Sequence, residues 1–388
     1  MRSLHVAALP FPTEQGTQAL IHRMLCALGE AGHETHLLCY PDAAFTRSGP
    51  YQIHRVRASI RLPSFRSGPS AHKLLLDLAL GTELGRLCAR LKPDMVIAHH
   101  VEAALAALAR RARPVWFVAH TSLHEELGGY FPAWTRRVWP RLGSALDRFL
   151  CQTADRTLAV SPALAALLTR ASGRAVCPLV PPWPSVAPID LGERAVARQE
   201  LAIASDEEVV LYAGNLDGYQ GLSELFAGVA QLSAARPRLS LLVATACSAE
   251  EVSSAAFAYP SLRLRRVELA GEVTRRRVYA ACNVVAVPRR IRGGIPVKLL
   301  DALARGAAVV AAPRALAGFS GMAEACSVVD APGDWADAIA RALDEPDRMR
   351  ALGQRARDYM QCQHTGARFV TSLVSPPEGA GCGLASLR

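Results

Sequence analysis

The sequence predicts an α/β protein with two doubly wound domains. In both halves of the chain, short apolar runs of strand length alternate with longer amphipathic segments, as in parallel sheets covered by helices. The proline-rich stretch 178–188 cannot form a regular helix or a central strand, so it separates the halves. With 388 residues, the chain can bury two cores. We expect an N-terminal domain over 1–177, a linker over 178–206, a C-terminal domain over 207–372 and a disordered tail over 373–388.

The composition favours an anionic partner. A net charge of +10 suits a nucleotide, an anionic membrane surface or a nucleic acid. Nothing but this charge supports nucleic acid, so we do not favour it. No apolar run is long enough to span a bilayer, and the N-terminal segment is too short for a signal peptide. The ten cysteines are scattered without a CxxC pair, so we expect no disulfide framework and a cytoplasmic setting.

The N-terminus predicts a βαβ unit. A strand is expected over 3–9, a helix over 18–31 and a second strand over 33–40. The turn before the helix contains Gly16 and Thr17, whose backbone N–H groups can contact a phosphate, although a simple tight turn is an equal alternative. The turn lacks a GxGxxG motif, so no dinucleotide fingerprint is predicted.

A basic region follows this unit. Residues 41–70 are predicted to be irregular, and 71–91 to be a helix with an apolar face of Leu74, Leu75, Leu78 and Leu87. Such a loop and helix can rest on anionic lipid headgroups, and a solvated loop beside an ordinary helix is the alternative. Aromatic and basic residues alternate over 130–150, which suits a membrane interface or arginine stems packed on tryptophans. The basic residues considered for membrane contact are Arg61, Arg66, Lys73, Arg136, Arg137 and Arg141.

Histidines follow two predicted strands of the N-terminal half. The strand 94–98 leads into His99 and His100, and the strand 114–119 leads into His120. Open α/β sheets bind ligands just beyond the carboxyl ends of their strands, so His120 is a candidate site residue. A structural histidine at a strand end is the alternative. The histidines also raise zinc, but no HExxH spacing supports a metal site.

The second half repeats the strand and helix rhythm. A strand over 209–213 leads into the loop 214–221, and a helix begins at Leu222. Further strands are expected over 239–244 and 262–267, and closing helices over 330–358.

The stretch RGGIPVKLLDALARGAAVVAA, at 292–312, predicts a loop, a helix and a buried strand. Its two glycines allow a ligand to approach the backbone, and Pro296 suits the first turn of a helix. Leucines at helical spacing follow, Gly306 ends the helix, and 307–312 is wholly apolar. A plain helix and strand of any doubly wound sheet is the alternative.

The start of this helix suits an anion. Helix N-termini carry free N–H groups and a partial positive charge, and Arg292 and Lys298 add full charges. Asp301, one turn further along, can accept hydrogen bonds from hydroxyl groups. A diphosphate at one end and a sugar at the other fit this arrangement best.

The same stretch resembles a known family. Retaining family 4 glycosyltransferases carry a segment with two glutamates spaced eight apart, the second of which begins E-A-x-A-x-G-x-P-V-V. PVKLLDALARGAAVVA is similar, with Asp301 at the second acidic position and Gly293, eight residues earlier, at the first. Gly16 and Gly32-His33-Glu34 are similar to the family's N-terminal pattern. DRTLAVS and CNVVAVPRR resemble its D-x-V-I-A-V-S and A-D-V-F-V-x-P-S segments. The resemblance implies a GT-B fold, with two Rossmann-like domains facing across a cleft.

The resemblance also implies a donor site. The loop 214–221 corresponds to the family's G-R-L-x-x-x-K-G, with Asn215 and Gln220 near its two cationic positions. Neutral amides hold phosphate less strongly than cations do, and we expect compensation from Arg289, Arg290, Arg292 and Lys298. The implied donor-binding residues are Gly16, Thr17, Asn215, Gln220, Arg292, Gly293, Gly294, Ile295, Pro296 and Lys298.

The implied reaction is transfer of a sugar from a nucleotide-diphosphate sugar to a hydroxyl acceptor, with retention and without a metal or cofactor. His120 and Asp301 are the expected catalytic residues. The acceptor is either a lipid, a lipid-linked sugar or polysaccharide precursor used at the inner face of a membrane, or a soluble molecule. Two alternatives stay open: a GT-B sugar-nucleotide epimerase, and a non-catalytic sugar-nucleotide-binding or membrane-docking scaffold, which the missing glutamate and cations would suit.

Overall fold

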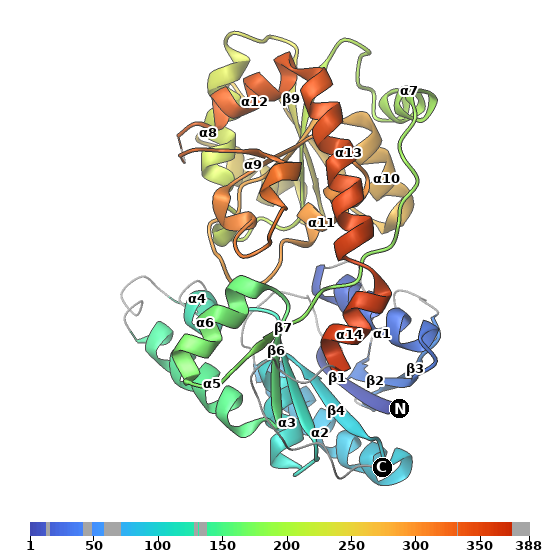
Figure 1. Cartoon of the computed structure of the whole chain (residues 1–388). Coiled ribbons are helices and arrows are strands. Elements are labelled where there is room, and N and C mark those ends of the chain that lie inside the picture. Colours follow the sequence, from blue (N-terminus) through green and yellow to red (C-terminus); the bar gives the residue numbers. More distant parts are fainter. Residues whose placement is uncertain are drawn as a thin grey trace. The chain divides into compact units, whose positions relative to one another are not determined.

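The computed structural model describes residues 1–12, 16–41, 49–57, 71–127, 131, 138–331 and 333–374, without the side chains of residues 71 and 72. The chain forms two compact units (Figure 1). The first comprises Met1–Phe11, Met24–Pro182 and the chain from Gly366 onward, and the second comprises Pro12–Arg23 and Trp183–Thr365. The main division therefore falls after Pro182, within the proline-rich stretch.

Among the described residues, the first unit is built on a seven-stranded parallel sheet in the order β3-β2-β1-β4-β5-β6-β7. Its strands are β1 (Arg2–Pro10), β2 (Glu34–Tyr40), β3 (Gln52–Arg55), β4 (Met95–His99), β5 (Val115–Ala119), β6 (Arg156–Ala159) and β7 (Cys177–Pro178). Its helices are α2 (Ala71–Leu91), α3 (His100–Ala109), α4 (Leu123–Glu126), α5 (Trp139–Thr153), α6 (Pro162–Ser172) and α14 (Gly366–Val374), and α1 (Gly16–Glu30) is divided between the two units. The strand order reverses between β1 and β4, which is where such sheets bind ligands.

Within its described residues, the second unit contains a six-stranded parallel sheet in the order β10-β9-β8-β11-β12-β13. Its strands are β8 (Glu208–Ala213), β9 (Leu239–Thr245), β10 (Leu264–Glu268), β11 (Val284–Val287), β12 (Val309–Ala311) and β13 (Ser327–Val328). Its helices are α7 (Leu191–Glu200), α8 (Leu222–Ser233), α9 (Ala249–Ala256), α10 (Gly271–Ala281), α11 (Val297–Ala304), α12 (Trp335–Asp344) and α13 (Pro346–Gln363), with 3-10 turns η3 (Gly218–Gln220), η4 (Pro313–Ala315) and η5 (Ala323–Ala325). Here the order reverses between β8 and β11.

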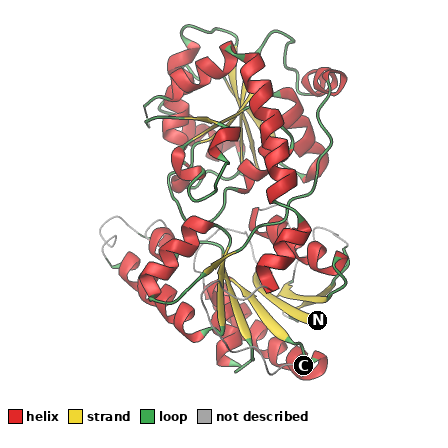
Figure 2. Cartoon of the chain, in the orientation of Figure 1, coloured by secondary structure: helices red, strands yellow, loops and turns green. Residues whose placement is uncertain are grey.

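Helices flank both sheets, and the central strands are largely apolar and buried, whereas the edge strands β3 and β10 carry polar and charged residues (Figure 2). The strand β9, LSLLVAT, is buried along its whole length. The core of the second unit includes Tyr212, Phe226 and Trp335. No helix in the described part of the chain is long and apolar enough to cross a membrane.

The predicted helix over 71–91 is confirmed as α2, but most of its predicted apolar face is wrong. Leu87 is buried, whereas Leu74, Leu75 and Leu78 are exposed. The face that packs on the core carries Leu76, Leu80, Leu84 and Leu87, which recur at intervals of four and three residues. In such a leucine-rich helix, the sequence offers more than one possible apolar face.

The predicted irregular segment 41–70 contains the short strand β3, which sequence reasoning missed. The membrane-contact candidates Arg61, Arg66, Arg136 and Arg137 lie outside the described residues. The tail predicted to be disordered begins at 373, but α14 extends to Val374, and 375–388 also lie outside the described residues.

The helix α11 is held at both ends. Pro296 is its N-cap, one residue earlier than predicted, and its carbonyl accepts the N–H of Leu299 at 2.8 Å. At the other end, the N–H of Gly306 donates to Leu303 and the N–H of Ala307 to Ala302, at 2.9 and 3.0 Å. This Schellman motif needs the φ of +66° that Gly306 adopts. The two caps set Lys298 in the first turn of α11 and Asp301 in the second.

Candidate functional site

Three predicted donor-site residues lie in one chain of hydrogen bonds in the second unit. The Nε2 atom of Gln220, in η3, donates to Oδ1 of Asn215, in the loop after β8, at 2.7 Å. The Nζ atom of Lys298, in α11, donates to Oε1 of Gln220 at 2.9 Å. The Nδ2 atom of Asn215 donates to Asp217. The loop beyond β8 and the start of α11 therefore meet at one place, next to the switch point between β8 and β11.

Lys298 is enclosed by an aromatic ring and a glycine. Its Nζ lies 3.9 Å from the centre of the Tyr212 ring, within reach of a cation–π interaction. Gly214 has a φ of +144°, which favours glycine, and a Cβ there would lie 2.8 Å from that Nζ. Burial, together with the nearby charge of Arg289, lowers the pKa of Lys298 well below its usual value, and Asp217 opposes the shift.

The loop before α11 is shaped by Arg289. This buried side chain donates from Nε to the carbonyl of Ile291 at 3.3 Å and from Nη2 to the carbonyl of Gly293. The predicted donor-site residues Gly293, Gly294, Ile295 and Pro296 are all buried. Arg292 is exposed, and Arg290 binds Glu224 on α8. Among the arginines considered from sequence, Arg289 is therefore the one whose charge acts on Lys298.

Gly16 lies against the start of α11. A Cβ built on Gly16 would be 3.3 Å from Cγ2 of Val297, the first residue of α11. Both Gly16 and Thr17 fall in the second unit and are at least partly solvent-accessible. The first turn of α1 and the first turn of α11 are therefore neighbours within that unit.

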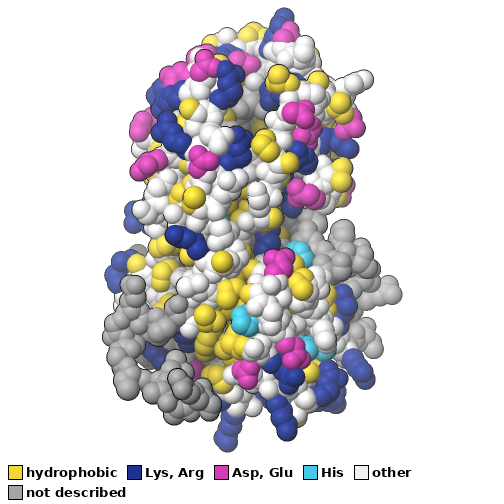
Figure 3. Space-filling view, turned by 45° about the vertical axis from the view of Figure 1, so that its right-hand side comes forward, with side chains coloured by type: hydrophobic (Ala, Val, Ile, Leu, Met, Phe, Trp, Pro, Cys, Tyr) yellow, Lys and Arg dark blue, Asp and Glu magenta, His cyan; other side chains and the backbone are white. Residues whose placement is uncertain are grey.

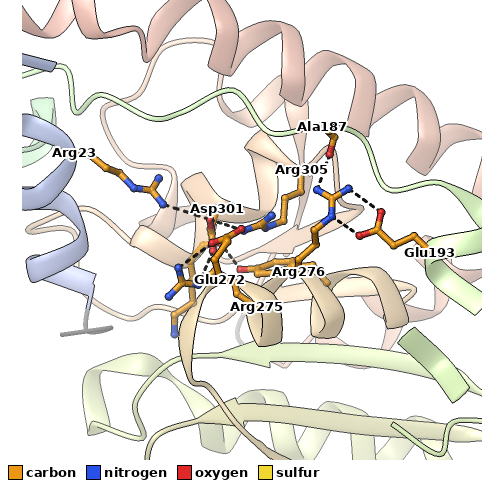
Figure 4. A network of polar contacts seen from close by, with 10 residues as sticks. Arg23, Ala187, Glu193, Glu272, Arg275, Arg276, Asp301 and Arg305 are labelled. Carbon is orange, nitrogen blue, oxygen red and sulfur yellow. Dashed lines mark hydrogen bonds and ion pairs between the residues drawn. The ribbon is translucent and has the colours of Figure 1, made fainter. Parts of the chain in front are cut away.

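Asp301 is buried among arginines (Figure 4). Its Oδ2 lies 3.3 Å from Nε of Arg275, and its Oδ1 lies 3.5 Å from Nη2 of Arg305 and 3.9 Å from Nη2 of Arg23. Burial raises the pKa of the Asp301 carboxyl, and Arg305, Arg275 and Arg23 oppose this rise. The carboxylate is thus part of an ion-pair network that joins α11 to α10 and α1.

Further contacts extend this network. Glu272 contacts Arg305 and lies 3.3 Å from Nη1 of Arg275. The guanidinium of Arg23 lies 3.2 Å over the Trp183 ring. Burial lowers the pKa of Arg23 to about 10. Sequence reasoning named none of these arginines, although the Asp301–Arg305 spacing of four residues was a visible signal.

His120, in the first unit, lies at one end of a chain of imidazoles. Its Nε2 is 3.0 Å from Nδ1 of His99, whose Nε2 is 2.9 Å from Nδ1 of His5. His100 stacks on His120 with ring centres 4.5 Å apart. All of these rings except His100 are fully or almost fully buried. Sequence reasoning found His99, His100 and His120 but missed His5, because nothing in an apolar strand marks its one histidine as functional.

These two sheets, each with polar loops beyond its strands, define a two-domain α/β protein of the GT-B type. Residues 15–182 match Glycosyltransferase Family 4, and residues 207–345 match Glycosyl transferases group 1. The two matches together cover most of the sequence, and the chain belongs to the family 4-like glycosyltransferases of the GT-B fold.

Known proteins resemble this chain in sequence and in structure. A D-inositol 3-phosphate glycosyltransferase of Segniliparus rotundus is 32% identical over 193 residues, which is 45% of this chain and 41% of that protein. The chain thus matches less than half the length of this curated relative. Sucrose-phosphate synthase from Thermosynechococcus elongatus has a TM-score of 0.79 at 18% identity, covering 96% of this chain and 97% of that one. Anabaena Alr3699/HepE in complex with UDP and glucose has a TM-score of 0.72 at 16% identity, covering 96% and 98%.

Proposed function

We propose that this glycosyltransferase moves a sugar from a nucleotide-diphosphate sugar to a hydroxyl acceptor, with retention of configuration. The observation that carries the proposal is the contact chain from Asn215 through Gln220 to Lys298, beside the N-terminus of α11. The UDP named with the Anabaena structure supports a nucleotide donor.

The donor diphosphate is proposed to bind at Lys298. Only one of the three ammonium N–H groups is needed for the hydrogen bond to Gln220, which leaves others for phosphate oxygens. In the described structure no side chain caps α11, so its first N–H groups can add to the same site. The backbone around the donor is proposed to come from Gly16, Thr17, Arg292, Gly293, Gly294, Ile295 and Pro296.

We propose that the positive charge at Lys298 and the N-terminus of α11 also acts in catalysis. As the sugar leaves, negative charge grows on the diphosphate and positive character on the sugar ring. Lys298 and the α11 amides stabilise that negative charge, so the reaction is proposed to need no divalent ion. The test is the initial rate with and without EDTA, which should be equal; a rate restored only by added metal would contradict this part.

His120 and Asp301 are proposed to contact the reacting sugars. His120 stands at the carboxyl edge of the first sheet, where its imidazole can hydrogen-bond a sugar oxygen. Asp301 is proposed to accept a hydrogen bond from a donor hydroxyl while its ion pairs with Arg275 and Arg305 hold it in place. This chain has Gly293 at the family's other acidic position. Asp301 is therefore the carboxylate that we assign to the hydrogen bond from the donor hydroxyl.

One experiment tests the central proposal. Nucleotide sugars are first screened by thermal shift, because a ligand at 100 times its Kd adds about 2.7 kcal/mol of stability. The donor found is then incubated with candidate acceptors, and the anomeric configuration of the product is read by NMR. A product with the donor's configuration supports the proposal. Donor binding without turnover would favour the non-catalytic scaffold, which the absence of a glutamate at Gly293 also suits.

We further propose that the first unit docks on an anionic membrane to reach a lipid or lipid-linked acceptor. Leu74, Leu75 and Leu78 are 66%, 55% and 70% exposed on one end of α2, directly after the arginine-bearing segment 58–70 of the sequence. On the face in Figure 3, Lys and Arg side chains project along the lower margin of this unit, with hydrophobic side chains above them. Exposed leucines beside basic residues are what an anionic bilayer surface binds. A soluble acceptor is the alternative.

A further inference from the structure

The imidazoles of His5, His99 and His120 lie in a diagonal line across one face of the sheet of the first unit. Residues paired in register on parallel strands point to the same face, as do residues two apart on one strand. Ala7 pairs with His99, and His99 pairs with Val118. His5 is two residues before Ala7, and His120 is two residues after Val118. The strand register therefore places all three residues on one face, in a line from the middle of β1 to the position just beyond the carboxyl end of β5.

Two hydrogen bonds connect these rings and leave one nitrogen at each end. His5 Nδ1 pairs with His99 Nε2, and His99 Nδ1 pairs with His120 Nε2. At the inner end, Nε2 of His5 is buried and has no hydrogen-bond partner in the described structure. At the outer end, Nδ1 of His120 is the remaining nitrogen, at the carboxyl edge of the sheet.

All three rings are neutral in the ordinary pH range. Burial lowers the pKa of His5 to about 3 and lowers the pKa values of His99 and His120 well below the usual value, with added repulsion from neighbouring imidazoles. A neutral imidazole has one N–H and one bare nitrogen. The two shared hydrogen bonds therefore allow only two arrangements: every ring carries its proton on Nδ1, or every ring carries it on Nε2.

The inner end distinguishes these arrangements. With protons on Nε2, His5 would bury an N–H that has no acceptor; with protons on Nδ1, it buries a bare nitrogen instead. Among buried backbone groups, an N–H without an acceptor is rarer than a C=O without a donor, and we apply the same order to the imidazole nitrogens. The Nδ1 arrangement is therefore favoured, and it makes Nε2 of His120 an acceptor from His99 and Nδ1 of His120 a donor.

We propose that His5 and His99 are positioning residues that hold His120 as its Nδ1–H tautomer and so make it a hydrogen-bond donor to a sugar oxygen. In this state the bare nitrogen of His120 is occupied by His99, so His120 donates a hydrogen bond and does not act as a general base. Only the identity of the sugar oxygen rests on the proposed transfer reaction; the tautomer is a property of the protein alone.

The deciding experiment is NMR of the full chain labelled with 15N-histidine, with the His120 signals assigned from their loss in His120→Ala. The proposal expects a protonated Nδ1 and a bare Nε2 on His120, and a mixture of tautomers in His5→Leu. His5→Asn should restore the single tautomer, since its amide N–H can donate where Nδ1 did. A proton on Nε2 of wild-type His120, or an unchanged tautomer in His5→Leu, would overturn the proposal.

Kinetics give a second readout once a donor and acceptor are found. Removing the partner that orients a metal-ligating histidine typically costs roughly 10- to 100-fold, and we expect a kcat loss of the same size in His5→Leu and its recovery in His5→Asn. His33→Leu, at a partly exposed histidine of the same unit outside the chain of rings, is the matched control and should keep the wild-type kcat. Equal kcat losses in His5→Leu and His5→Asn would contradict positioning. The NMR result stands even if no transfer is detected, so failure of the proposed reaction and failure of this proposal are distinguishable.

Discussion

Lys298 donates a hydrogen bond from its Nζ to Oε1 of Gln220 at 2.9 Å, and so joins the first turn of α11 to the loop beyond β8. Gln220 stands near a position that carries a cation in the resembled family. The amide thus does not replace the cation; it binds Lys298, which we propose supplies the charge from α11.

Lys298→Ala is expected to weaken binding of a nucleoside diphosphate. The variant removes a partly buried ammonium from the phosphate site, and losing such a charge partner costs about 2–5 kcal/mol. Arg292→Ala should cost no more than about 1 kcal/mol because Arg292 is exposed. Titration calorimetry on both variants checks this, with exposed Arg290→Ala as the control. If neither Lys298→Ala nor Arg292→Ala changes the affinity, the donor assignment is wrong.

Binding of the diphosphate is expected to take up a proton. Burial and Arg289 lower the pKa of Lys298 in the free protein, whereas a bound diphosphate favours its charged form and raises that pKa. Calorimetry in two buffers of different ionisation enthalpy measures the uptake, which should vanish in Lys298→Met. Uptake that persists in this variant would assign the proton to another group.

The same shift gives a sign for stability against pH. Between the lowered pKa of folded Lys298 and the ordinary value of 10.5, the unfolded chain binds one more proton at this lysine than the folded chain. Its contribution to the free energy of unfolding therefore rises with pH through this window and levels off above 10.5. Urea denaturation of wild type and Lys298→Met across this window should differ in slope in that direction.

Asp301→Asn is expected to lower turnover and leave diphosphate binding nearly unchanged. The substitution keeps the shape but removes a charged acceptor for sugar hydroxyls. It also breaks buried ion pairs with Arg275 and Arg305, which should cost about 3–5 kcal/mol of stability. Assays therefore run at a temperature where urea denaturation shows the variant folded. If diphosphate binding falls as much as turnover, Asp301 serves the structure alone.

Replacing the exposed leucines of α2 is expected to release the protein from membranes. Wild type should float with anionic vesicles at low salt, dissociate as salt screens the charges and ignore neutral vesicles. Leu75→Gln with Leu78→Gln should abolish flotation. Leu191→Gln, at a leucine 85% exposed on α7 of the second unit, is the matched control and should float normally. Wild type that stays in the soluble fraction at low salt would remove the membrane proposal and leave the transferase proposal intact.

The order of the long strands was predictable because each is marked locally, whereas the helices α5, α6, α7 and α9 were not predicted. Apolar runs marked β1, β8 and β9, and the glycine at 306 marked the end of α11. The two-residue strands β7 and β13, and β3 within a basic segment, were missed because such short runs carry no period.

The candidate site was predictable in its residues but not in their partners. Lys298, Gln220 and Asn215 were named separately, and only the fold shows that they touch. Asp301 was expected to face hydroxyl groups, yet its carboxylate lies among guanidiniums from α10 and α1, segments that are far from it in sequence. Contacts of this kind depend on the packing of whole helices, which no local pattern encodes.

Each unit contains a segment from the other half of the chain: the first unit includes the residues from Gly366 onward, and the second includes Pro12–Arg23. This affects how the gene can be divided. A fragment cut at the proline-rich stretch to give 1–182 would lack α14, whose Phe369 and Leu373 are buried in the first unit. The complementary fragment from Trp183 would lack Arg23, the partner of both Asp301 and the Trp183 ring. We therefore expect that neither fragment folds alone, and that the two fragments must be expressed together to yield soluble protein.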